Sequence, residues 1–161
     1  MRAFQRGNSG VVALFNPDEA AIIRNLAAQV AGMVLAVNDV ANGGGAPDPA
    51  MKRLFPDAYP EDAEASAEFR KFTSRGLATR KADNADSVIR TLDAADESGA
   101  IILDAADAAA WLRSLTDMRL TLAARLGIER EDQPPAADSV MQDVYDWLGF
   151  IQNSLVEALE D

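Results

Sequence analysis

The segment that most constrains the fold of this chain is residues 111–128, because it combines a clean helical period with a marked end. The apolar side chains that recur there at helical spacing are Trp111, Leu115, Leu122 and Leu126. Residues at this spacing line one face of an α-helix. Gly127 is typical of the position that follows the end of a helix. The sequence therefore predicts a central helix from about residue 105 to 126.

A β-hairpin is predicted on the N-terminal side of the chain, over residues 3–15. Two apolar runs there flank a group of turn formers, Gly7, Asn8, Ser9 and Gly10. The short apolar run at 100–103 is either a third strand or a buried loop. A third strand would support the hairpin, since a lone hairpin is marginal in water. We expect a mainly α-helical domain with a small N-terminal β-hairpin, extended by this third strand if the first alternative holds.

Further helices are expected on both sides of the central one. Asn16, Pro17 and Glu19 provide an N-cap, a first helical residue and a capping box. The predicted buried face of the helix that they begin consists of Ile22, Leu26, Val30, Met33 and Val37. Two more helices are predicted over about 61–74 and 77–96, the second with Val88, Ile89 and Leu92 on one side. A last helix follows Ser139.

The chain length of 161 residues predicts a single domain over 1–161. Two linkers are expected inside it, a glycine-rich one at 42–48 and an acidic one at 129–138. The glycine run is not a phosphate-binding loop, because it follows a helix and is not followed by Lys and Ser or Thr.

The composition excludes several kinds of chemistry. The chain contains no cysteine and no histidine, so a disulfide, a thiolate zinc site and a histidine-based triad are all impossible. Paired acids such as Glu64 and Glu68 are better explained by a solvated helix face than by a metal site. No group of Asp, Glu, Lys or Tyr shows a recognised catalytic spacing. We predict no catalytic, metal-binding or cofactor-binding residue, and hence no enzyme.

The charge of the chain is −11 and is unevenly distributed, since residues 129–161 hold nine acids and one base. Such a charge disfavours binding to nucleic acid or to an anionic membrane. Neither a signal peptide nor an apolar run long enough to span a bilayer is visible. We therefore expect a cytoplasmic protein.

One basic patch interrupts this acidic chain, and its members are Arg70, Lys71, Arg75, Arg80 and Lys81. Phe69 and Phe72 are interleaved with it, which is a pattern found where proteins contact nucleic acid. A solvated helix face explains the same residues, as does a patch that neutralises the acidic C-terminal part of this copy or another. Nucleic-acid contact is the less favoured of these interpretations, because the net charge opposes it.

The candidates for a structural or interface role are Trp111, Asp117, Arg119, Trp147 and Phe150. Arg119 lies within an apolar stripe, so its charge must reach solvent, pair with an acid or contact a partner. Asp117 is two residues away and must point to a different partner. Both tryptophans lie in apolar stripes and are expected in the core. Phe150 is expected to stay partly exposed.

Three segments together resemble the signature blocks of an actinobacterial family catalogued as a domain of unknown function, which includes the actinomycete oxidative-stress regulators. These segments are residues 53–60, 111–128 and 147–155, and the resemblance covers essentially the whole chain. The central helix of that family usually reads Asn-Asp-Leu-Arg-Leu. Residues 116–120 match it at Asp117, at Arg119 and at the final leucine.

The resemblance implies a non-enzymatic regulator that responds to oxidative stress by engaging a sigma factor. The switch of that family is a disulfide between two cysteines, which this chain cannot form. We expect a regulatory protein that acts through protein–protein interaction, with a sigma factor as its partner and a homodimer as its state. The alternative is a DNA-contacting regulator that uses the patch at residues 70–81.

Overall fold

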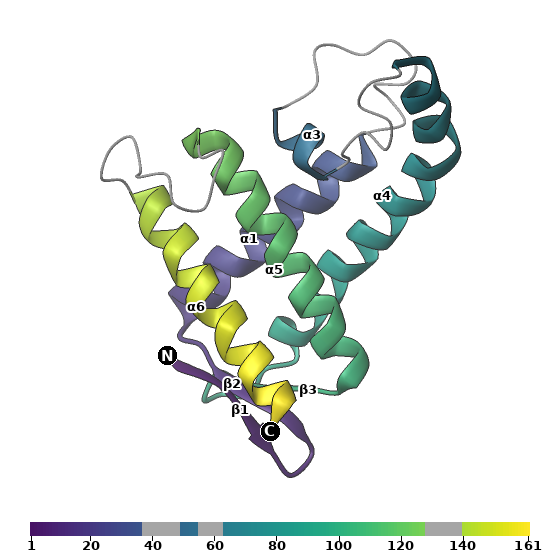
Figure 1. The fold of residues 1–161 in the computed structure, drawn as a ribbon. Coiled ribbons are helices and arrows are strands. Elements are labelled where there is room, and N and C mark those ends of the chain that lie inside the picture. The colour runs from purple at the N-terminus through teal and green to yellow at the C-terminus, as the bar shows by residue number, and fades with distance from the viewer. Residues whose placement is uncertain (37–48, 55–62, 128–139) are drawn as a thin grey trace.

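The structure is a computed structural model that describes residues 1–36, 49–54, 63–127 and 140–161 (Figure 1). Its elements, in chain order, are β1 (Arg2–Gly7), β2 (Gly10–Leu14), α1 (Pro17–Leu35), α3 (Pro49–Leu54), α4 (Ala63–Asp93), β3 (Ala100–Leu103), α5 (Ala105–Leu126) and α6 (Val140–Glu160). The predicted fold class is confirmed, because a mainly helical chain carries one small sheet. The linkers expected at 42–48 and 129–138 lie outside the described residues.

The sheet is antiparallel with the strand order β1-β2-β3, and a turn at residues 8–9 joins its first two strands. β3 pairs with β2 and places Val12 opposite Ile102. The third strand is thus confirmed, and the alternative of a buried loop is wrong. Gly10 has a φ of +140°, and a Cβ on it would lie 2.3 Å from the carbonyl oxygen of Leu103. Only glycine allows this close approach of the two strands.

The start of α1 is the predicted capping box. The backbone N–H of Glu19 donates to Asn16 Oδ1 at 2.8 Å, and that of Asn16 donates to Glu19 Oε1 at 2.9 Å. Its buried residues are Ile23, Leu26, Ala27, Val30 and Val34. The prediction of Ile22 in this face is wrong, since 37% of that residue is exposed. Ile22 and Ile23 are both apolar, so the period alone did not choose between two orientations of the helix.

Helix α4 corrects the prediction of two separate helices over 61–74 and 77–96. It runs unbroken from Ala63 to Asp93 and packs against α1 and α5 (Figure 1). A glycine inside a helix costs about 1 kcal/mol relative to alanine, which packing against neighbouring helices can offset. After the helix, Asp96 Oδ1 accepts hydrogen bonds from the backbone N–H groups of Ser98 and Ala100. This turn leads the chain into β3.

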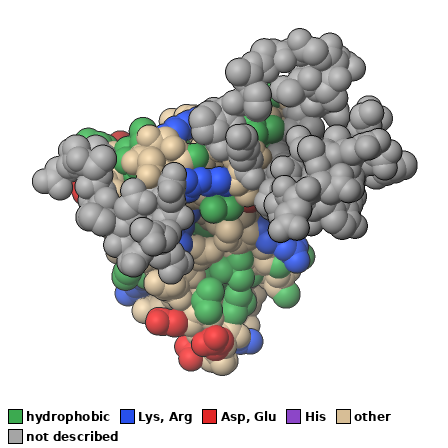
Figure 2. All heavy atoms as spheres, turned by 45° about the horizontal axis from the view of Figure 1, so that its top comes forward, with side chains coloured by type: hydrophobic (Ala, Val, Ile, Leu, Met, Phe, Trp, Pro, Cys, Tyr) green, Lys and Arg blue, Asp and Glu red, His purple; other side chains and the backbone are tan. Residues whose placement is uncertain are grey.

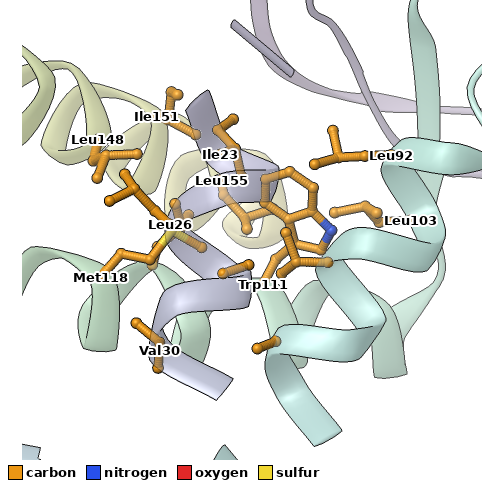
Figure 3. Close-up of a cluster of buried hydrophobic side chains, with 14 of the residues drawn as sticks. Ile23, Leu26, Val30, Leu92, Leu103, Trp111, Met118, Leu148, Ile151 and Leu155 are labelled. Atoms are coloured by element: carbon orange, nitrogen blue, oxygen red, sulfur yellow. The ribbon is translucent and has the colours of Figure 1, made fainter. Parts of the chain in front are cut away.

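Trp111 of α5 joins the sheet to the helices at the centre of the core (Figure 3). Its ring stacks on Phe15, with centroids 6.0 Å apart, and makes a T-shaped contact with Phe4, with centroids 5.5 Å apart. Its Nε1–H donates to Thr91 Oγ1 of α4 at 2.8 Å. Trp147 is only half-buried and packs edge-on against Phe15 from α6.

The described part of the chain contains no helix with the length and apolarity needed to cross a membrane.

Helix α5 has the predicted span and lies between α4 and α6 (Figure 1). Asp104 caps its first turn by accepting from the backbone N–H of Asp107 at 2.8 Å. Gly127 ends it in the left-handed conformation, with a φ of +74°. Since α5 contacts a helix on each side, its polar residues can serve two different interfaces.

Candidate binding and interaction site around helix α5

One turn of α5 directs polar side chains toward both neighbouring helices. Successive helical residues are about 100° apart, so Asp117 and Arg119 point to sides about 200° apart. Asp117 contacts Lys81 of α4, and Arg119 contacts Gln152 of α6. Thr116, on the same turn, also contacts Gln152. The segment that resembles the family's signature thus links three helices.

The contact on the α4 side is an ion pair between a half-buried lysine and a buried carboxylate. Lys81 Nζ lies 2.7 Å from Asp117 Oδ1, and the exposed fractions of the two side chains are 16% and 4%. Burial raises the pKa of Asp117, whereas the hydrogen bond and the positive charge of Lys81 oppose that rise. Asp117 Oδ2 is also buried and has no hydrogen-bond partner among the described residues. One oxygen of a buried carboxylate therefore remains unused, which is unfavourable.

A hollow of about 610 Å³ opens between α4 and α5 beside this ion pair. The described residues that line it are Leu77, Arg80, Lys81, Asp83 and Asn84 from α4 and Arg113, Thr116 and Asp117 from α5. Both sets recur at helical spacing, so each helix offers one face to the hollow. The lining contains three cations and two carboxylates, an excess of positive charge in a chain whose net charge is −11.

The structure brings two members of the predicted basic patch to this hollow, Arg80 and Lys81. The backbones of Arg70, Lys71 and Arg75 lie on α4, but their side chains are outside the described part of the structure. Lys81 is engaged by Asp117, a partner 36 residues away that the sequence pattern did not indicate. The patch is therefore not a uniform row of free cations.

The contact on the α6 side holds the guanidinium of Arg119 in a fixed position. Its Nη1 donates to Gln152 Oε1 at 3.1 Å, and its Cζ lies 4.7 Å from the centroid of the Tyr145 ring. A Cβ on Gly149 would lie 3.1 Å from Nη2, so the guanidinium rests on bare backbone. Gln152 also donates to Thr116 Oγ1 at 2.7 Å. We name these five residues the α5–α6 clasp.

The clasp contains residues that sequence reasoning missed. No carboxylate in the described ranges lies within ion-pair distance of Arg119, so the option of an acidic partner does not apply there. Tyr145, Gly149 and Gln152 recur at steps of four and three, which places them on one face of α6. The sequence did contain a signal for this contact, because a glycine and a polar residue recur at helical spacing on the face of α6 beside its apolar stripe.

The opposite side of α6 is acidic and carries an exposed aromatic ring. Phe150 has 54% of its surface exposed. The acids of the helix are Asp143, Asp146, Glu157 and Glu160, and α6 has no lysine or arginine. In Figure 2, acidic side chains gather at the lower end of the molecule, the end at which the C-terminus lies in Figure 1. We name the surface formed by Phe150, Asp143, Asp146, Glu157 and Glu160 the outer face of α6.

Comparison with known proteins gives two matches. The model of a family described as a domain of unknown function, DUF2017, matches residues 1–159. A protein of Mycobacterium leprae (strain TN) with the name "Putative oxidative stress regulator AosR" is 33% identical over 129 residues. The match covers 70% of this chain and 58% of the relative, so the chain spans less than two thirds of that protein. No solved structure matches the chain.

Proposed function

This chain belongs to the DUF2017 family, and from that premise we propose that it is a regulatory protein which acts by binding another protein. The family description assigns no activity, but the name of the Mycobacterium leprae relative supports a role in regulation. We place the protein in the cytoplasm, without an enzymatic activity of its own. A link to oxidative stress follows from the same relative.

The observation that carries the proposal is the outer face of α6. Phe150 exposes an aromatic ring there, and aromatic side chains are enriched among the residues that dominate binding energy. The helix around it has four acids and no base, so its charge is complementary to a basic partner. On its other side, the clasp and the buried residues Leu148, Ile151 and Leu155 fix α6 to the core. The ring is thus presented on a well-anchored helix, which lowers the entropic cost of binding.

We propose that the occupant of this face is a basic segment of a sigma factor that offers an apolar recess to Phe150. The charge of the face supports the basic character of the partner, and the family resemblance supports a protein of the transcription machinery. A second copy of this chain is the competing occupant, because the basic residues of α4 could meet the acids of α6.

The experiment measures the affinity of the purified chain for each sigma factor of the cells it comes from, by biolayer interferometry. Phe150→Ala is expected to weaken the interaction by about tenfold or more, as for truncation of a central interface residue. Ile102→Ala is the matched control, because Ile102 is 57% exposed on β3, outside α6. If both variants weaken the interaction equally, or if neither weakens it, the outer face of α6 is not the binding surface. If the chain binds none of the sigma factors, the proposal that its partner is a sigma factor is wrong.

Sedimentation of the same two variants tests the competing occupant. A dimer that forms with rising concentration in the unchanged chain, and that Phe150→Ala but not Ile102→Ala abolishes, would assign the face to a second copy. A monomer at all concentrations would leave the face free for another protein. We do not adopt the DNA-contacting alternative, because the net charge of −11 opposes binding to phosphates.

A further inference from the structure

We propose that the outward side of β3 around Ile102, which we name the β3 edge, binds an extended basic segment of a partner protein. The segment adds to the sheet as a further antiparallel strand. Backbone hydrogen bonds to Ile102 and apolar contact with its side chain hold it there. The β3 edge contains no residue of α6, so the inference is independent of partner binding by that helix.

The two edges of the sheet differ in what covers them. The strand order is β1-β2-β3, so β1 and β3 are the edge strands. Helix α6 packs on β1, where the backbone N–H of Phe4 donates to Ser154 Oγ at 3.2 Å. On the same strand, Arg6 Nη1 donates to the carbonyl oxygen of Ala158 at 3.4 Å. The side of β3 away from β2 is therefore where another strand can be added.

The backbone of Ile102 directs its hydrogen-bonding groups away from β2. The N–H of Phe15 donates to the carbonyl oxygen of Gly99 at 3.1 Å, and bonded pairs alternate along an antiparallel ladder. The register of β2 with β3 is regular, so Ile101 and Leu103 make the ladder bonds of β3. The N–H and C=O of Ile102, which lies between them, consequently point to the β3 edge.

These two groups of Ile102 remain available for a partner. Ala100 is the other residue of β3 whose groups point outward, and the preceding turn satisfies it. Its N–H donates to Asp96 Oδ1 at 3.2 Å, and its carbonyl oxygen accepts from the N–H of Asp96 at 3.4 Å. The outward groups of Ile102 have no such partner in the described part of the chain. One residue directly opposite Ile102 in an antiparallel strand would exchange both bonds with it.

The side chain of Ile102 supplies the apolar part of the site. It is 57% exposed, whereas Ile101 and Leu103 are 2% and 1% exposed, because successive strand side chains point to opposite faces. Val12, which lies opposite Ile102 on β2, is half-buried. Edge strands of soluble proteins usually carry charged residues or proline that discourage pairing. An exposed isoleucine beside unpaired backbone groups is instead a surface that an added strand would cover.

The charges around β3 favour a basic partner. Residues 91–112 contain no lysine or arginine and five acids, namely Asp93, Asp96, Glu97, Asp104 and Asp107. Arg24 neutralises Asp93, and Arg90 neutralises Asp107. The other three acids flank β3 at both of its ends and make no ion pair within the described ranges. Their charge attracts a basic segment and repels a second copy of this chain, whose own β3 would bring the same acids.

The test titrates the full chain with a synthetic peptide, Lys-Thr-Lys-Val-Lys-Thr-Lys with blocked ends, and follows the backbone amide resonances of Ile102 and Asp104 by NMR. The single valine fixes the register of the peptide opposite Ile102. We expect saturable shifts of both resonances. The same peptide with glutamate in place of lysine should cause none, because its charge has the same sign as that of the site.

Methylation of single peptide nitrogens tests the backbone pairing. In an antiparallel strand the N–H of the valine donates to the carbonyl oxygen of Ile102, whereas the N–H of the adjacent lysine points away from β3. N-methylation of the valine should weaken binding about tenfold more than N-methylation of that lysine, since only the first removes a hydrogen bond to the chain. Equal losses, or a greater loss from the lysine, would show that the peptide does not add as this strand.

Two variants of the chain complete the test. Ile102→Ala should weaken binding of the lysine peptide about tenfold, because it removes apolar surface that the valine covers. Phe150→Ala should leave this binding unchanged, since Phe150 is 54% exposed but lies on α6. The two variants exchange roles between this titration and the sigma-factor measurement, so either proposal can fail without the other. No saturable shift with the lysine peptide, equal binding of the glutamate peptide, or equal losses in the two variants would overturn the proposal.

Discussion

The α5–α6 clasp predicts that the effect of Gly149→Ala depends on whether Arg119 is present. Alanine in place of glycine inside a helix stabilises it by about 1 kcal/mol. In the unchanged chain, however, the new Cβ would lie 3.1 Å from Arg119 Nη2 and 3.3 Å from Cζ, so the guanidinium must shift. That shift weakens the hydrogen bond to Gln152 and the contact with Tyr145, together about 1–2 kcal/mol for a half-buried group.

The two terms oppose each other, so Gly149→Ala alone should change the free energy of unfolding by between 0 and about −1 kcal/mol. In an Arg119→Ala background the steric term is absent, and the same substitution should stabilise the protein by about 1 kcal/mol. The coupling energy between the two positions is therefore about 1–2 kcal/mol, within the usual range for residues in contact.

Urea unfolding of the four proteins of this cycle, followed by circular dichroism, measures the coupling. The slope of the transition should be the same in all four, because the surface exposed on unfolding barely changes. Gly32→Ala in α1 is a matched control, since a Cβ there would meet nothing within 4 Å, and it should stabilise both backgrounds equally. If Gly149→Ala stabilises the chain equally with and without Arg119, the guanidinium does not rest on Gly149 and the clasp is wrong.

Two further predictions concern the buried carboxylate and the tight turns. Burial raises the pKa of Asp117 above the usual value of 3.8, so the folded state holds that proton more tightly than the unfolded state. The stability that the protonated group contributes is therefore lost as the pH rises from 3.8 through the folded-state pKa. The stability of Asp117→Asn relative to the unchanged chain should therefore increase over that window in denaturant titrations at several pH values, and a flat or falling difference would contradict the raised pKa. Gly99→Ala should destabilise the chain well beyond the loss of about 1–2 kcal/mol expected for Gly127→Ala, since both glycines have positive φ but only at Gly99 would the Cβ lie 2.1 Å from the carbonyl oxygen of Phe15. Thermal unfolding of the two variants compares these costs, and equal losses would show that the contact with Phe15 yields easily.

The elements of this fold could be predicted where local chemistry decides them. The capping box at Asn16, the glycine that ends α5 and the turn formers of the hairpin all act within a few residues of their own position. The failures occurred where tertiary packing decides. The orientation of α1 depends on which isoleucine faces α4 and α5, and the continuity of α4 through Gly76 depends on helices that the local sequence does not contain.

The candidate site was less predictable, because each of its contacts joins residues far apart in the chain. Asp117 and Lys81 are 36 residues apart, and Arg119 and Gln152 are 33 apart, so no local window contains either pair. Lys81 appeared among five basic residues that suggested a common role, but in the structure it neutralises a buried acid. The useful signal was instead the conflict between charged residues and their burial in an apolar helix. A carboxylate and a guanidinium within one turn of an otherwise apolar helix oppose burial unless other elements satisfy them, and such conflicts concentrate at functional sites. Arg119 finds Gln152, Tyr145 and the bare backbone at Gly149, and Asp117 finds Lys81, yet Arg119 Nε and Asp117 Oδ2 are both buried without a hydrogen-bond partner among the described residues, so the conflict in this turn is only partly resolved.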